Sequence, residues 1–202
     1  MAPGTAPGRA QSADLPVLAF ASADEFERWL EREHARSRGI WLRFAKKGSG
    51  VDSVSYEQAV LVALCFGWID GQARSEGDAS WLQRFTPRTR KSVWSQLNRQ
   101  RVYELIEQGR MRPAGRAEIE KAKADGRWDA AYAPPSTATV PPDLAEALAA
   151  APDAEAVFAG LDSQNRYAIL HRIATARRPE TRAARIATFV AMLRNGEVLY
   201  PR

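Results

Sequence analysis

Segments with the composition of β-strands all lie before Pro87, whereas the elements predicted after it all follow helical spacing. The runs that favour strands are short, rich in β-branched and aromatic residues and bounded by turn residues; they cover residues 15–20, 40–44, 68–73 and 81–86. Strands gathered in one part of the chain, with helices gathered in another, are typical of an α+β fold. The sequence therefore predicts a small antiparallel sheet packed with helices, followed by an all-helical C-terminal module.

Local signals place the elements within this scheme. Glu76-Gly77-Asp78 is a turn between two predicted strands, which indicates a β-hairpin ended by Pro87. Ser22-x-x-Glu25 and Ser55-x-x-Gln58 have the spacing of capping boxes, and each precedes an apolar helical stripe. Ser92 is placed to cap the next helix.

Four segments follow from these elements. We expect a disordered Ala/Pro/Gly-rich tail at residues 1–12 and an α+β domain at 13–131. Four prolines in the segment from Tyr132 to Pro142 predict a linker at 132–142, and the helical C-terminal module then occupies 143–202.

Composition restricts the compartment and the chemistry. One cysteine excludes an internal disulfide and fits a reducing, cytoplasmic setting. No apolar run approaches the roughly 18 residues of a membrane span. His34 and His171 lie far apart without cysteine partners, which argues against a zinc site, so we expect no metal and no cofactor.

The positive charge is concentrated in one region. The chain carries a formal net charge of +5, yet no Asp or Glu occurs from Ala79 to Tyr103. This basic segment holds six cations, so the rest of the chain sums to 5 − 6 = −1. An anionic partner is expected to bind there. The cations are Arg84, Arg88, Arg90, Lys91, Arg99 and Arg101.

The basic segment and the stretch LCFGWIDGQA before it supply the candidate ligand-binding residues. Arginine forks suit phosphate or carboxylate groups, hydroxyls near a helix start favour anions, and aromatic rings can stack on a base or ring. The alternative is a solvated basic loop followed by a capped helix. The candidates are Trp68, Asp70, Arg84, Arg88, Ser92, Trp94, Ser95 and Asn98.

Asp70 has two interpretations. A carboxylate within an apolar run needs a partner, and Arg84 or Arg88 is placed to return across the hairpin and meet it. The pair is then either structural or part of an anion-binding or acid–base site. No GxSxG, Walker, GxGxxG or HExxH motif is present, and no residue is assigned a catalytic role. The arginines from Arg177 to Arg194 are expected to form a solvated face.

Several motifs together resemble the YdeI/OmpD-associated (bacteriocin-protection) family of bacteria. They are Trp41-Leu42 with Lys46-Lys47, Ala63 to Gly71, Thr86-Pro87-Arg88, Ser92-x-Trp94-Ser95-x-x-Asn98, Gly109-x-Met111-x-Pro113-Ala114-Gly115 and Pro179-Glu180-Thr181-Arg182-x-x-Arg185-Ile186. The resemblance implies a YjbR/CyaY-like α+β architecture with a helical closing module. It also implies a link to bacteriocin or cationic-peptide tolerance, a form of stress tolerance, and no defined reaction.

Three functions remain open at this stage. The first is a soluble binding protein with a basic anion-binding face for an anionic small molecule or a protein partner. The second is an enzyme acting on a small phosphorylated or carboxylated substrate. The third is a nucleic-acid-binding protein, for which the modest net charge is unfavourable. The sequence does not define the oligomeric state.

Overall fold

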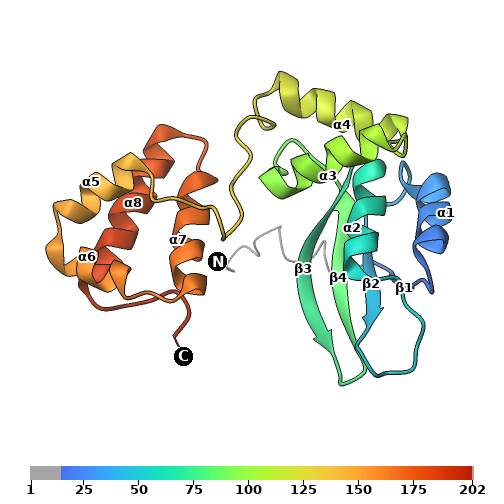
Figure 1. Ribbon diagram of the computed structural model, residues 1–202, viewed down its shortest axis with the longest axis horizontal. Coiled ribbons are helices and arrows are strands. Elements are labelled where there is room, and N and C mark those ends of the chain that lie inside the picture. Colours follow the sequence, from blue (N-terminus) through green and yellow to red (C-terminus); the bar gives the residue numbers. More distant parts are fainter. Residues whose placement is uncertain (1–14, 202) are drawn as a thin grey trace, which may run out of the picture. The chain divides into compact units, whose positions relative to one another are not determined.

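The computed structural model describes residues 15–201, which form two compact units. The first unit holds residues 15–92 and 98–129, and the second holds 93–97 and 130–201. The tail expected at residues 1–12 lies outside the described residues. In Figure 1 the first unit contains the sheet and the second contains helices only, so the chain is an α+β protein as the sequence predicts.

The sheet of the first unit has four strands in the order β1-β2-β4-β3. They are β1 Val17–Ala19, β2 Ile40–Ala45, β3 Trp68–Glu76 and β4 Ser80–Pro87. β3 and β4 form the predicted antiparallel hairpin, and β2 is antiparallel to β4. The sheet is nevertheless mixed, because β1 pairs parallel to β2. The intervening helix α1 carries the chain back across the sheet, which is the connection a parallel pair requires.

Helices α1 (Ala23–Glu33) and α2 (Tyr56–Cys65) pack against one face of this sheet. The ring of Phe26 from α1 lies 5.8 Å from that of Phe85 on β4. The ring of Tyr56 from α2 lies 6.1 Å from that of Phe44 on β2. Phe26, Phe44 and Phe85 are buried, so this layer between helices and sheet is the core of the first unit.

Capping places the two helices largely as predicted. At α2 both halves of the capping box form, since Ser55 accepts from Gln58 N and the Gln58 side chain accepts from Ser55 N. At α1 only the Ser22 half forms, because the Glu25 carboxylate accepts from the preceding Ala21 N. The half-formed box still satisfies two backbone donors at the start of α1.

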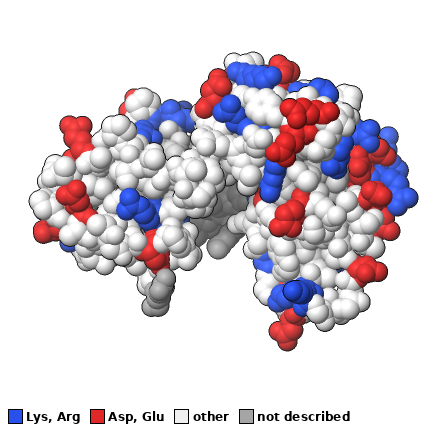
Figure 2. Space-filling model, in the orientation of Figure 1, with Lys and Arg blue, Asp and Glu red and all other residues white. Residues whose placement is uncertain are grey.

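The later helices α3 (Gln96–Glu107) and α4 (Pro113–Ala124) close the first unit. The predicted cap at Ser92 is wrong, because α3 begins at Gln96 and Ser92 closes a turn with Thr89. Basic and acidic side chains lie close together over the region of α4 in Figure 2. Within α4, ion pairs join Lys121 to Glu118 and Lys123 to Glu120. These exposed pairs contribute little to stability.

The second unit is a bundle of four helices. They are α5 Pro142–Ala149, α6 Pro152–Ala159, α7 Ser163–Ala174 and α8 Pro179–Arg194. Its core is a continuous apolar cluster that includes Leu144, Leu148, Phe158, Ile169, Ile173, Phe189 and Leu193. The side chain of Asp162 caps α7 by accepting from Asn165 N at 2.8 Å. Residues 93–97 join this unit through a short parallel bridge between Ser95 and Tyr132.

Within residues 15–201, no helix combines the length and the apolar character needed to cross a membrane.

Candidate functional site

Asp70 lies on β3 and faces the helices, not the arginines. It is in register with Phe85, so its side chain shares the sheet face that α2 covers. Its Oδ2 accepts from the Tyr56 hydroxyl at 2.7 Å and from Gln83 Nε2 at 3.4 Å. The predicted Asp70–arginine pair is therefore wrong. Arg84 neighbours Phe85 along β4, and the pleat directs its side chain to the opposite face.

Arg84 packs on that opposite face beside Gly71. A Cβ added at Gly71 would lie 3.1 Å from both Nε and Nη2 of Arg84, so the guanidinium covers the glycine. Arg84 is in register with Trp41 on β2. The guanidinium of Arg74 lies over the Trp41 ring, 4.3 Å from its centroid. The Arg84 Nε is buried and makes no hydrogen bond to any described residue.

Three other candidates are interior residues. Trp68 and Trp94 are each 1% exposed, so their rings are unavailable for stacking on a ligand at the surface. Trp68 Nε1 instead donates to His34 O at 3.3 Å. Arg88 is 6% exposed, and its backbone N–H donates to Gly67 O at 3.0 Å. Trp68 and Arg88 are therefore interior residues at the end of the hairpin, and Trp94 is an interior residue of the second unit.

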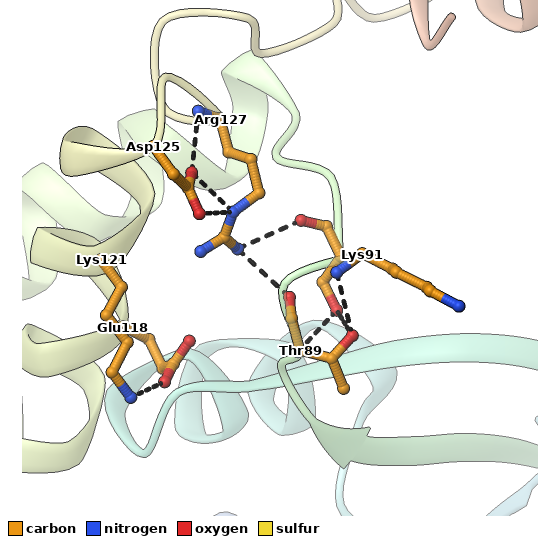
Figure 3. Close-up of polar contacts among 7 residues, drawn as sticks. Thr89, Lys91, Glu118, Lys121, Asp125 and Arg127 are labelled. Carbon is orange, nitrogen blue, oxygen red and sulfur yellow. Dashed lines mark hydrogen bonds and ion pairs between the residues drawn. The ribbon is translucent and has the colours of Figure 1, made fainter. Parts of the chain in front are cut away.

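The loop after Arg88 is held by an arginine from a distant part of the sequence. Arg127 is 3% exposed and forms an ion pair with Asp125 at 2.8 Å. Its Nη1 donates to the carbonyl oxygens of Thr89 and Ser92, each at 3.3 Å, and Figure 3 shows the guanidinium between Asp125 and Thr89. Ser92 Oγ accepts from Thr89 N at 3.0 Å, which closes the turn. Ser92 thus has a structural partner inside the loop.

The remaining residues of the basic segment are distributed over α3 and its approach. Asn98 Oδ1 accepts from Arg101 Nη1 at 3.2 Å. Arg99 lies over the Trp128 ring at 5.2 Å. Ser95 belongs to the second unit through its bridge with Tyr132. The six cations are accordingly divided between strand, loop and helix.

The helical unit contains a pocket that was not predicted from the sequence. It has a volume of about 610 Å³ and runs along α7. Its wall combines two guanidinium groups, an imidazole, two phenol rings and a threonine hydroxyl, and no carboxylate of residues 15–201 lines it. We call it the arginine pocket; these groups belong to Arg172, Arg185, His171, Tyr167, Tyr200 and Thr175.

The two arginines of this pocket are held by neutral acceptors. Arg185 Nη1 donates to the carbonyl of Arg172 and contacts Thr175 Oγ1 at 3.5 Å. Arg172 Nη2 donates to the Tyr200 hydroxyl at 3.3 Å. Among residues 15–201, neither arginine forms an ion pair, so both positive charges lack a counterion from the described chain. An anion in the pocket would supply it.

The pKa of His171 is affected by the charges of the same two arginines. Its ring packs edge-on against Tyr132 at 4.5 Å and lies 5.7 Å from the Tyr167 ring. Burial lowers the pKa of His171 below its usual 6.5, and the nearby Arg172 and Arg185 lower it further. At neutral pH the imidazole is therefore uncharged and can donate one hydrogen bond and accept another.

The sequence offered one weak signal for this pocket. The spacing Tyr167, His171, Thr175 repeats every fourth residue and places three polar side chains on one face of α7. Arg185 was grouped with the solvated arginines, because nothing in a single sequence shows which of several arginines lacks a carboxylate neighbour.

Comparison with known proteins gives two family matches. Residues 18–118, half of the chain, match the model of a family described as a domain of unknown function, DUF8412. Residues 137–196 match the model of the family described as bacteriocin-protection, YdeI or OmpD-associated. Neither the curated proteins nor the solved structures contain a match. The similarity to the bacteriocin-protection family thus lies in the helical unit.

Proposed function

The chain belongs to the family of the domain of unknown function DUF8412, and from that premise we propose that it is a binding protein whose helical unit holds an anionic small molecule in the arginine pocket. The observation that carries the proposal is the pair of guanidinium groups, Arg172 and Arg185, in a pocket to which the described residues contribute no carboxylate. Charge-assisted contacts from two arginines favour a phosphate, sulfate or carboxylate group.

The aromatic wall extends the proposed recognition beyond charge alone. The rings of Tyr167, His171 and Tyr200 line the same pocket as the arginines. A ligand that joins an anionic group to a planar ring would use both kinds of contact. A nucleotide or an aromatic carboxylate has this chemistry, and a volume of about 610 Å³ accommodates a ligand of that size.

The match over residues 137–196 supports a link to bacteriocin tolerance, because that segment contains most of the arginine pocket. Charge argues against direct capture of a cationic peptide there, since Arg172 and Arg185 would repel it. We propose that the tolerance function acts through an anionic ligand in the cytoplasm. The YjbR/CyaY-like architecture stays a proposal for the first unit.

The test is a binding screen on the full chain. Thermal shift and calorimetry with inorganic phosphate, citrate, AMP and single-stranded DNA define the ligand class. Arg172→Gln and Arg185→Gln are expected to weaken the best ligand roughly 10- to 100-fold, the equivalent of about 1.5–3 kcal/mol for a lost charged contact. Arg178→Gln is the matched control, because Arg178 is exposed and lies outside the pocket lining.

Three outcomes separate the open functions. Wild-type affinity in both pocket variants would contradict the proposal. If Arg84→Gln alone lost binding, the ligand site would lie on the sheet, where the basic segment begins, and not in the arginine pocket. A steep loss of affinity with added salt, seen for DNA only, would favour nucleic acid as the partner.

A further inference from the structure

Between Glu180 and Arg194, none of the exposed residues of α8 is charged. Ala183, Ala187 and Ala191 are exposed and follow one another at intervals of four residues. They form a line of small side chains, which we call the alanine stripe, together with the neighbouring exposed Thr188. A helix that remains in water normally presents a polar outer face, so this surface resembles one that is covered.

A groove runs beside the alanine stripe. It has a volume of about 590 Å³ and lies between α8 and the start of α5. Its only carboxylate among the described lining residues, Asp143, is already paired with Arg182 by two hydrogen bonds. The apolar floor includes Ile186 and Val190. A partner must therefore present a narrow and uncharged surface along most of its length.

Two free charges mark the ends of the stripe. Glu180 and Arg194 are both exposed, and neither forms an ion pair within residues 15–201. They lie at equal sequence distance on either side of Ala187. At 100° per residue, both side chains project within about 20° of the direction of Ala187. The stripe thus begins with a negative charge and ends with a positive one on a single line.

This order of charges is self-complementary when the helix is reversed. We propose that α8 is the contact surface for a second copy of this chain, with the two helices antiparallel and the twofold axis at Ala187. Glu180 of each copy then faces Arg194 of the other, and Ala183 faces Ala191. A parallel arrangement would place like charges together, so the charge pattern selects the antiparallel one.

The size of the contact sets the expected strength. Glu180 and Arg194 are about 21 Å apart along the helix axis at 1.5 Å per residue. Small residues allow two axes to approach to about 8 Å, which buries backbone as well as side chains. A contact of this length lies at the small end of stable interfaces. The dimer is therefore reversible and depends on protein concentration. It does not depend on the ligand proposed for the arginine pocket.

Sedimentation velocity of the full chain across a range of concentrations tests the dimer. Wild type is expected to shift from monomer to dimer, and Ala187→Glu to remain monomeric because it places two carboxylates at the axis. Ala159→Glu, at an exposed position on α6, is the control and should dimerise as wild type does. A wild type that is monomeric at every concentration would overturn the proposal.

Charge reversal tests the register. Arg194→Glu should weaken dimerisation at least tenfold by facing Glu180 of the other copy, and the double variant Glu180→Arg with Arg194→Glu should restore it. Failure of the double variant to recover, with an unchanged melting temperature, would overturn the antiparallel arrangement.

Cross-linking gives an independent readout. Ala187→Cys places two thiols face to face at the axis, close enough for a disulfide between copies. The native Cys65 does not interfere, because it is buried and burial raises the pKa of its thiol to about 11. Oxidation should link the Ala187→Cys chains and leave Ala159→Cys chains largely unlinked. Equal linking of both variants would argue against a specific contact.

Discussion

The hydroxyl of Tyr56 donates to Asp70 Oδ2 at 2.7 Å and ties α2 to the edge strand β3. Gln83 Nε2 contacts the same oxygen at 3.4 Å and the Gly71 carbonyl at 2.7 Å. The carboxylate is half-buried and faces neutral donors. Its burial is thus compensated by hydrogen bonds from Tyr56 and Gln83 and not by an opposite charge.

A double-mutant cycle measures this contact. Tyr56→Phe and Asp70→Asn should each lower the free energy of unfolding by about 1–2 kcal/mol, since a hydrogen bond to a charged group contributes about 1.5–3 kcal/mol when well formed. The double variant should lose less than the sum, with a coupling of about 1 kcal/mol. Additive losses in urea denaturation would show that the two groups act separately.

Arg127 is predicted to fix the loop from Thr89 to Ser92. Arg127→Met keeps the stem but removes the donors to two carbonyls and the ion pair with Asp125. We expect a loss of about 1–3 kcal/mol in the free energy of unfolding, because the carbonyls of Thr89 and Ser92 lose a charged donor and Asp125 loses its ion-pair partner. Amide hydrogen exchange should rise in this loop. The control is Arg116→Met, an exposed arginine on α4, which should be nearly neutral.

Gly115 is expected to reverse the usual effect of replacing glycine in a helix. Gly→Ala within a helix normally stabilises by about 1 kcal/mol. A Cβ at Gly115 would instead lie 2.3 Å from the Cys65 carbonyl oxygen, a backbone atom at the end of α2. Gly115→Ala should therefore destabilise by about 1–3 kcal/mol.

The matched control is Gly160→Ala. Gly160 has φ −83°, and its added Cβ would meet nothing closer than 3.7 Å. This variant should be neutral or slightly stabilising in thermal denaturation. A Gly115→Ala protein as stable as Gly160→Ala would show that α2 and α4 can separate without cost.

Local periodicity was sufficient to predict most helices and strands of this fold. The hairpin ended by Pro87 and the capping box at Ser55 depend on neighbours close in sequence, and both are present. The parallel pairing of β1 with β2 was not predicted, because it depends on where α1 returns the chain. The starting point of α3 was also missed, because Ser92 has a closer partner in Thr89.

The candidate site was likewise predicted only where it depends on residue type and not where it depends on the tertiary arrangement. Residue type correctly suggested that Asp70 needs a partner, but the choice among Arg84, Arg88 and Tyr56 depends on which sheet face each occupies. Side chains along β3 and β4 point alternately to the two faces of the sheet, so the register between the strands determines which residue can contact Asp70. That register cannot be predicted from a single sequence. The arginine pocket was missed for a similar reason, since its side chains come from α7, α8 and the segment after α8.

Anion affinity in the arginine pocket should increase as the pH falls. Burial, Arg172 and Arg185 lower the pKa of His171, so the folded protein binds its proton less readily than the unfolded chain does. The free protein should accordingly lose stability as the pH drops below about 6.5. A bound anion offsets the two arginine charges, raises the pKa of His171 and thereby couples anion binding to proton uptake.

Calorimetric titration with sulfate provides the measurement, because the charge of sulfate does not change between pH 7.5 and 5.5. Wild type should bind roughly fivefold more tightly at the lower pH, which corresponds to about 1 kcal/mol for one added charge near the surface. His171→Gln keeps a polar side chain without titrating in this range, so its sulfate affinity should be nearly constant. An identical pH dependence in both proteins would remove His171 from the site, while the loss of sulfate binding in Arg185→Gln would still identify the pocket.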